Sequence, residues 1–106
     1  MKRLVLPLIL AMAGPAGAAH VDSWDGRWTG AWGGYNATAV VVADGRVVSY
    51  EYGGQTKPVT KSRVTPQQII YEGLNSVVTM TRTGPNTAHA TIHTFMGDGT
   101  AELERR

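Results

Sequence analysis

Two histidines four residues apart are the first candidates for chemistry in this chain of 106 residues. The alternation of small apolar and polar residues around His89 and His93 predicts a strand, which places both side chains on one face. At a rise of ~3.4 Å per residue, their Cα atoms lie about 13 Å apart. One metal ion held at ~2.0–2.1 Å from each nitrogen cannot bridge that distance. We therefore expect surface histidines that face Glu102 or Glu104, and no metal site.

The sequence offers little support for catalysis. A hydrolase triad needs Ser, His and a carboxylate within hydrogen-bond reach, and the motif Gly-x-Ser-x-Gly is absent. No Asp or Glu lies within an apolar strand face, where burial would raise its pKa for acid–base work. We expect no catalytic residue and no cofactor, and an enzyme of unknown type remains only a third alternative.

Three tryptophans recur every four residues near the start of the chain, at Trp24, Trp28 and Trp32. Glycines between them, including Gly30, make a helix costly at ~1 kcal/mol each relative to Ala. On a strand, Trp28 and Trp32 share one face with Gly30 between them, and we expect this glycine to leave room for both rings. We expect Trp28 to be a structural core residue that closes one end of the fold. The alternative is a platform that stacks on a sugar or another flat ligand, which suits Trp32 and Tyr35 better.

The elements that must position these residues are short segments rich in Val, Thr, Ile and aromatics, separated by turn signals. This is an all-β pattern, and Asp44-Gly45 is the signal for a tight hairpin. Alternation predicts that Val48, Tyr50 and Tyr52 share a face, and the two tyrosines join the candidate ligand-binding residues. We predict a small antiparallel meander of eight strands, closed as a barrel or strongly rolled, with a mostly filled interior. The predicted strands cover residues 27–32, 37–43, 46–52, 59–64, 69–72, 76–82, 87–95 and 100–105.

The first 19 residues predict a signal peptide, with a basic start, an apolar run of about ten residues and small residues near Ala19. Residues 20–106 then form a single domain that is secreted or periplasmic, without a stable membrane anchor. Removal of Lys2 and Arg3 leaves eight of the ten basic residues against eight acidic ones, a net charge of zero. A nucleic-acid partner is therefore not expected, because such proteins carry a basic surplus. With no Cys, the domain depends on its core alone.

Two resemblances to known families add to this interpretation. Gly26-Arg27-Trp28, the Asp44-Gly45 turn and Tyr50-Glu51-Tyr52 resemble the opening of calycin-type barrels, which include lipocalins and avidins. In lipocalins the Trp closes the floor of the barrel, often under a basic side chain of the last strand. The resemblance implies this arrangement for Trp28 and Arg105.

The chain after the signal peptide also resembles a group of small secreted bacterial proteins without an established activity. Their pattern starts with Asp-Gly-x-Trp-x-Gly-x-Trp and continues with Thr-Arg-Thr-Gly-Pro-x-Thr-Ala. The resemblance implies the compartment and the fold, and no chemistry. The matching segments here are residues 25–32, 47–50, 81–91 and 101–103.

These observations favour a non-enzymatic binding or protein-interaction module of the cell envelope, acting through an aromatic rim at Trp32 and Tyr35. An inhibitor of an envelope-directed enzyme would belong to this class. The alternative is a calycin-like carrier of a small apolar ligand, because small residues could leave interior space. A basic group around the fourth predicted strand also allows an acidic partner protein. The small residues are Ala88, Ala90 and Ala101, and the basic ones are Lys57, Lys61 and Arg63.

Overall fold

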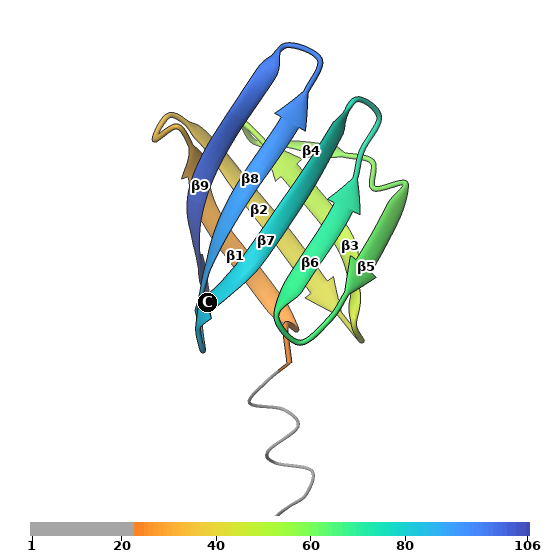
Figure 1. The fold of residues 1–106 in the computed structure, drawn as a ribbon, viewed down its shortest axis with the longest axis vertical. Helices are drawn as coiled ribbons and strands as arrows, with labels where there is room; N and C mark the ends of the chain where they lie inside the picture. Colours follow the sequence, from red (N-terminus) through yellow and green to blue (C-terminus); the bar gives the residue numbers. More distant parts are fainter. Residues whose placement is uncertain (1–22) are drawn as a thin grey trace, which may run out of the picture.

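The computed structural model describes residues 23–106, so the predicted signal peptide at 1–19 and the first three residues of the predicted domain lie outside the described part. The described chain is all-β, and its antiparallel sheet curls into a half-barrel (Figure 1). The strands are β1 (Gly26–Trp32), β2 (Asn36–Ala43), β3 (Arg46–Tyr52), β4 (Gln55–Lys57), β5 (Lys61–Val64), β6 (Gln68–Glu72), β7 (Ser76–Gly84), β8 (Thr87–Thr94) and β9 (Gly97–Arg105).

The strand order in the sheet is β4-β3-β2-β1-β9-β8-β7-β6-β5, so the first strand pairs with the last. This pairing aligns Trp28 with Arg105 and Thr29 with Glu104. The two edge strands, β4 and β5, follow one another in the chain and lie on opposite layers of the curled sheet (Figure 1). No helix in residues 23–106 has the length and hydropathy needed to cross a membrane.

The predicted antiparallel meander is confirmed, but the sheet has nine strands rather than eight. The additional strand is β4, which pairs with the end of β3 and stops before Pro58. Proline has no N–H to donate to a ladder, so pairing with β3 ends there. The chain then crosses to the other layer, where β5 begins at Lys61 instead of at the predicted Val59 and pairs with β6.

The predicted faces of the last two strands are confirmed. Ala88, Ala90 and Ile92 of β8 are buried, as are Ala101 and Leu103 of β9. These residues belong to one hydrophobic core that fills the concave side of the sheet. Its buried members are Trp24, Trp28, Trp32, Val40, Val42, Val47, Tyr50, Ile69, Tyr71, Val78, Met80, Ala88, Ala90, Ile92, Ala101 and Leu103.

The predicted face of β3 is wrong at its start. Val47 is buried, whereas Val48 is 51% exposed and does not share the inward face with Tyr50. The cause is a β-bulge, because Val42 pairs with Val47 while Val41 pairs with Ser49. Val48 is the extra residue, and an extra residue reverses the faces on one side of the bulge.

Gly30 marks a close approach between the first and last strands. A Cβ added to Gly30 would lie 2.3 Å from the Glu102 backbone oxygen and 2.6 Å from Leu103 Cδ2. The sequence-based expectation was that this glycine makes room for the flanking tryptophan rings. The nearest atoms come from β9 instead, so Gly30 is required for the β1–β9 contact.

Candidate functional site

The lower end of the half-barrel in Figure 1, where β1 begins, is closed by two tryptophans whose ring planes are tilted by 51°. The ring centroids of Trp24 and Trp28 lie 5.1 Å apart. Both indole N–H groups donate hydrogen bonds of 2.8 Å, from Trp24 to the Thr65 carbonyl oxygen and from Trp28 to that of Trp24. The segment before β1 is thereby fixed against the β5–β6 connection. We call Trp24, Trp28, Arg82 and Arg105 the closed end.

Two arginines complete the closed end. The guanidinium carbon of Arg105 lies 4.8 Å from the Trp28 ring centroid, and that of Arg82 lies 4.9 Å from the Trp24 ring centroid. Arg105 Nη1 also donates to the carbonyl oxygens of Ser23 at 2.6 Å and Asp25 at 3.0 Å. The structure thus places Arg105 over Trp28, in the arrangement that the lipocalin resemblance implies. This cation–π geometry is favourable.

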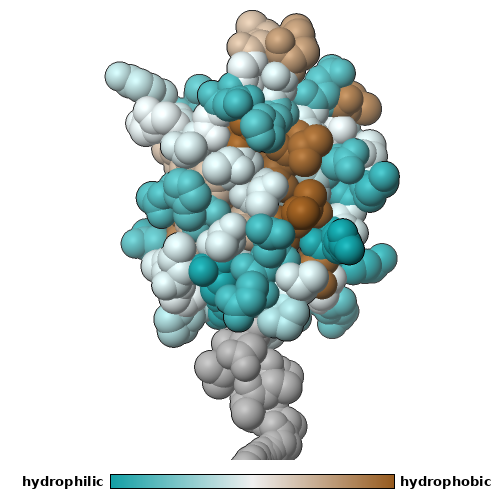
Figure 2. Space-filling view, viewed as in Figure 1, coloured by the Kyte–Doolittle hydropathy of each residue, from teal (hydrophilic) through white to brown (hydrophobic). Residues whose placement is uncertain are grey.

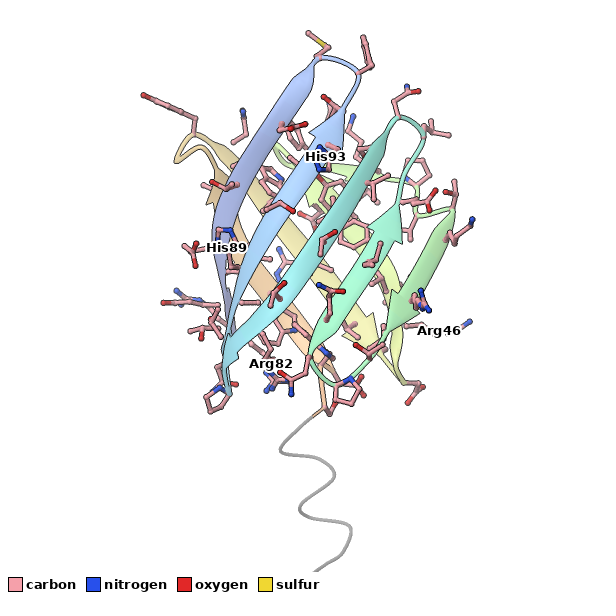
Figure 3. The ribbon with its side chains drawn as sticks, viewed as in Figure 1. Arg46, Arg82, His89 and His93 are labelled. Carbon is pink, nitrogen blue, oxygen red and sulfur yellow. The ribbon has the colours of Figure 1, made fainter. Side chains whose placement is uncertain are left out.

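Arg82 is a closed-end residue that the sequence analysis missed. It lies near the end of β7 (Figure 3), and its Nη2 donates to the Pro85 carbonyl oxygen at 2.7 Å. Arg105 Nη2 donates to the same oxygen. The approach of Arg82 to the indoles depends on the curl of the sheet, which no local sequence signal reveals.

At the opposite end, the strands and loops surround a cleft of about 570 Å³, which we call the open-end cleft. Large apolar side chains flank it in solvent, with Leu74 75%, Phe95 82% and Met96 83% exposed. Apolar side chains are visible at the tip of the β8–β9 hairpin in Figure 2. The residues that line the cleft are Tyr50, Tyr52, Lys57, Pro58, Gly73, Leu74, Asn75, Ser76, Ile92, Thr94, Phe95 and Met96.

The open-end cleft gathers two of the four predicted ligand-binding residues, Tyr50 and Tyr52. Trp32 and Tyr35 do not line it. Trp32 is 4% exposed and belongs to the core, whereas Tyr35 is 91% exposed in the β1–β2 turn. These two side chains therefore do not form a shared aromatic surface.

Buried polar atoms lie in the core near this end. Within residues 23–106, the hydroxyl of Tyr71 is buried without a hydrogen-bond partner. The rings of Tyr50 and Tyr71 are 5.2 Å apart. Burial raises the pKa of Tyr71 far above its usual value, and the neighbouring Tyr50 adds to the rise. Burial also raises the pKa of Tyr50, while the nearby Trp32 and Thr38 side chains oppose that rise.

Lys57 is the one lining residue of the open-end cleft with a formal charge. It pairs with Tyr50 across β3 and β4, and paired residues of neighbouring strands project from the same face of a sheet. Because the Tyr50 side chain is buried in the core, the Lys57 side chain also projects from the concave face of the sheet. Its Nζ donates to Gln55 Oε1 at 3.2 Å.

The two histidines lie on the outer face of β8 (Figure 3), each beside a carboxylate of β9. His89 Nδ1 contacts Glu102 Oε2, as the sequence predicted, and His93 Nδ1 lies 2.7 Å from Asp98 Oδ1 rather than beside Glu104. Among the described residues, no three His, Cys, Asp or Glu side chains are close enough together to hold a metal ion.

The predicted basic group is divided in the structure. Lys57 belongs to the open-end cleft, while Lys61 and Arg63 are exposed on β5. Lys61 Nζ lies 3.9 Å from Glu72 Oε2.

Comparisons with protein-family models, with curated proteins and with solved structures find no match to this chain.

Proposed function

We propose that this protein is a non-enzymatic binding module of the cell envelope that takes an apolar group of its ligand or partner in the open-end cleft. The supporting observation is the cleft itself, whose volume of about 570 Å³ is flanked by the exposed side chains of Leu74, Phe95 and Met96. Sites for small molecules typically measure ~300–1,000 Å³ and are largely apolar. Exposed apolar side chains gathered around one concavity are typical of an interaction surface.

The position of the cleft moves the proposed site away from the rim at Trp32 and Tyr35. Tyr50 and Tyr52 remain in the proposal, because they form part of the cleft wall. We also propose, from the sequence patterns given above, that the protein is exported and that its first hairpin is similar to that of calycin-type barrels.

A carrier of a small apolar ligand is the second candidate, and the cleft volume favours it. The interior alanines do not supply its space. Ala88, Ala90 and Ala101 are buried members of the packed core, and none of them lines the cleft. A carried ligand would therefore sit at the open end, in contact with solvent.

The test uses a neutral apolar fluorophore, N-phenyl-1-naphthylamine, titrated into the protein. We expect bound probe to become brighter, and the double variant Leu74→Ser/Phe95→Ser to weaken its binding by about ten-fold, since two apolar contacts are lost. The matched control is Tyr35→Ser, which removes an exposed aromatic that does not line the cleft and should bind the probe as the unchanged protein does.

Absence of probe binding, or equal binding by the double variant and the unchanged protein, would contradict the proposal. Native mass spectrometry of protein purified from its own host separates the two candidates. A copurifying small molecule supports the carrier, and its absence favours a module that meets its partner outside.

A further inference from the structure

We infer that the ligand of the open-end cleft is a small amphipathic anion: an apolar chain or ring system with one carboxylate, which Lys57 binds. This inference rests on the proposed function and specifies its ligand. The supporting observation is the combination of an apolar concavity with a single ammonium-bearing residue, the exposed Lys57, in its lining.

The direction of Lys57 follows from strand pairing. Tyr50 pairs with Lys57, and Tyr52 pairs with Gln55. All four side chains therefore project from the concave face of the sheet. β4 therefore brings an ammonium group and an amide to a wall whose other members include Ile92 and the two tyrosines.

The electrostatic setting of Lys57 favours a negative ligand. None of the lining residues is acidic, and Lys57 forms no ion pair within residues 23–106. Lys57 Nζ donates a hydrogen bond to the neutral amide of Gln55, with 3.2 Å between Nζ and Oε1. By contrast, Lys61 lies beside Glu72 and Arg27 beside Glu51. Lys57 is exposed, so a ligand carboxylate gains from it what a surface ion pair provides.

The rest of the cleft suits the apolar body of such a ligand. Ile92, Leu74, Phe95 and Met96 offer aliphatic, aromatic and thioether surface around the same concavity. Flexible Met side chains adapt to ligands of different shape. The cleft therefore fits a medium-chain carboxylate, with its chain against these residues and its head group at β4.

A structural role for Lys57 makes a different prediction. An inward charge on an edge strand can discourage pairing with another chain, and β4 is such an edge. In that case, removal of the charge would promote self-association and leave ligand preference unchanged.

Calorimetric titrations with three ten-carbon ligands test the inference: decanoate, decan-1-ol and decylammonium, all below the concentration at which they form micelles. The unchanged protein should bind decanoate about two- to five-fold more tightly than decan-1-ol, the range expected of one exposed charge pair, and decylammonium most weakly. Lys57→Gln should abolish the difference between decanoate and decan-1-ol. Lys61→Gln, which removes an exposed lysine outside the cleft, should preserve it.

The outcomes separate the inference from the proposed function. Equal binding of decanoate and decan-1-ol, or an undiminished preference in Lys57→Gln, overturns the head-group inference and leaves the apolar site standing. Failure of all three ligands and of the neutral fluorophore to bind overturns both. Size-exclusion chromatography of Lys57→Gln completes the test, since self-association combined with an unchanged preference assigns Lys57 to edge protection and refutes the inference.

Discussion

The two ends of the half-barrel differ in how their aromatic side chains are packed and hydrogen-bonded. At the closed end, both indole N–H groups have acceptors, and Arg105 bonds to backbone carbonyls while lying over Trp28. At the open end, Phe95 and Met96 are exposed, and the nearby Tyr71 hydroxyl is buried without a partner in the described chain. The contacts of the closed end stabilise the fold, whereas the open end has exposed apolar side chains and a buried polar group without a hydrogen-bond partner.

The largest effect should come from the centre of the closed end. Trp28 is fully buried, so Trp28→Ala should lower the free energy of unfolding by about 3–5 kcal/mol. Phe95→Ala at the open end should change it by less than about 0.5 kcal/mol, because the side chain is already in solvent. Urea titrations monitored by circular dichroism measure both. Similar losses in the two variants would remove the contrast between the ends.

Loss of the Arg105 guanidinium should have the next largest effect. Arg105→Met keeps much of the aliphatic stem but removes the contact with Trp28 and the donors to the Ser23 and Asp25 carbonyl oxygens. We expect a loss of about 2–3 kcal/mol, from hydrogen bonds made by a charged group and a cation–π contact. Arg63→Met, on exposed β5, is the matched control and should stay within about 0.5 kcal/mol. A change in Arg105→Met no larger than in this control would contradict the role assigned to Arg105.

The unpartnered hydroxyl of Tyr71 gives a smaller, pH-dependent effect. Its pKa is raised in the folded state, so its contribution to stability is present below pH ~10, where unfolded tyrosine ionises, and falls as the pH rises further. One such group makes the free energy of unfolding fall by up to about 1.4 kcal/mol per pH unit above that value. Tyr71→Phe should remove this slope and move alkaline unfolding to higher pH.

At neutral pH, Tyr71→Phe should cost less than about 1 kcal/mol or be stabilising, because it deletes a buried hydroxyl without a partner. Tyr35→Phe, in solvent, should leave the alkaline unfolding curve unchanged. Unfolding midpoints measured between pH 8 and 12 on each variant test this prediction. A marked decrease in the free energy of unfolding of Tyr71→Phe at neutral pH would show that the hydroxyl is hydrogen-bonded.

Local signals in the sequence were sufficient for much of the fold. Val- and Thr-rich alternation predicted the strands, and Asp44-Gly45 predicted a hairpin whose two residues have φ values of 53° and 74°. The bulge at Val48 was missed because strict alternation cannot reveal an inserted residue. The separate strand before Pro58 was missed for a related reason: it is only three residues long and has no apolar alternation.

The candidate site was only partly predictable. Tyr50 and Tyr52 were expected to act together, and they line one cleft. Lys57, Leu74 and Met96 were not predicted to join them. These residues lie in three separate parts of the chain, which only the curl of the sheet brings together. The available signal was the Phe95-Met96 pair immediately before Gly97, since hairpin tips usually carry polar residues.

The division between a stabilising end and a binding end is tested most directly by two-dimensional NMR of the ¹⁵N-labelled protein titrated with decanoate. We predict progressive shifts of the backbone amides of Tyr52, Leu74 and Phe95, with the indole N–H signals of Trp24 and Trp28 unmoved. Shifts centred on those two indoles, or no shift at the three amides, would contradict the account.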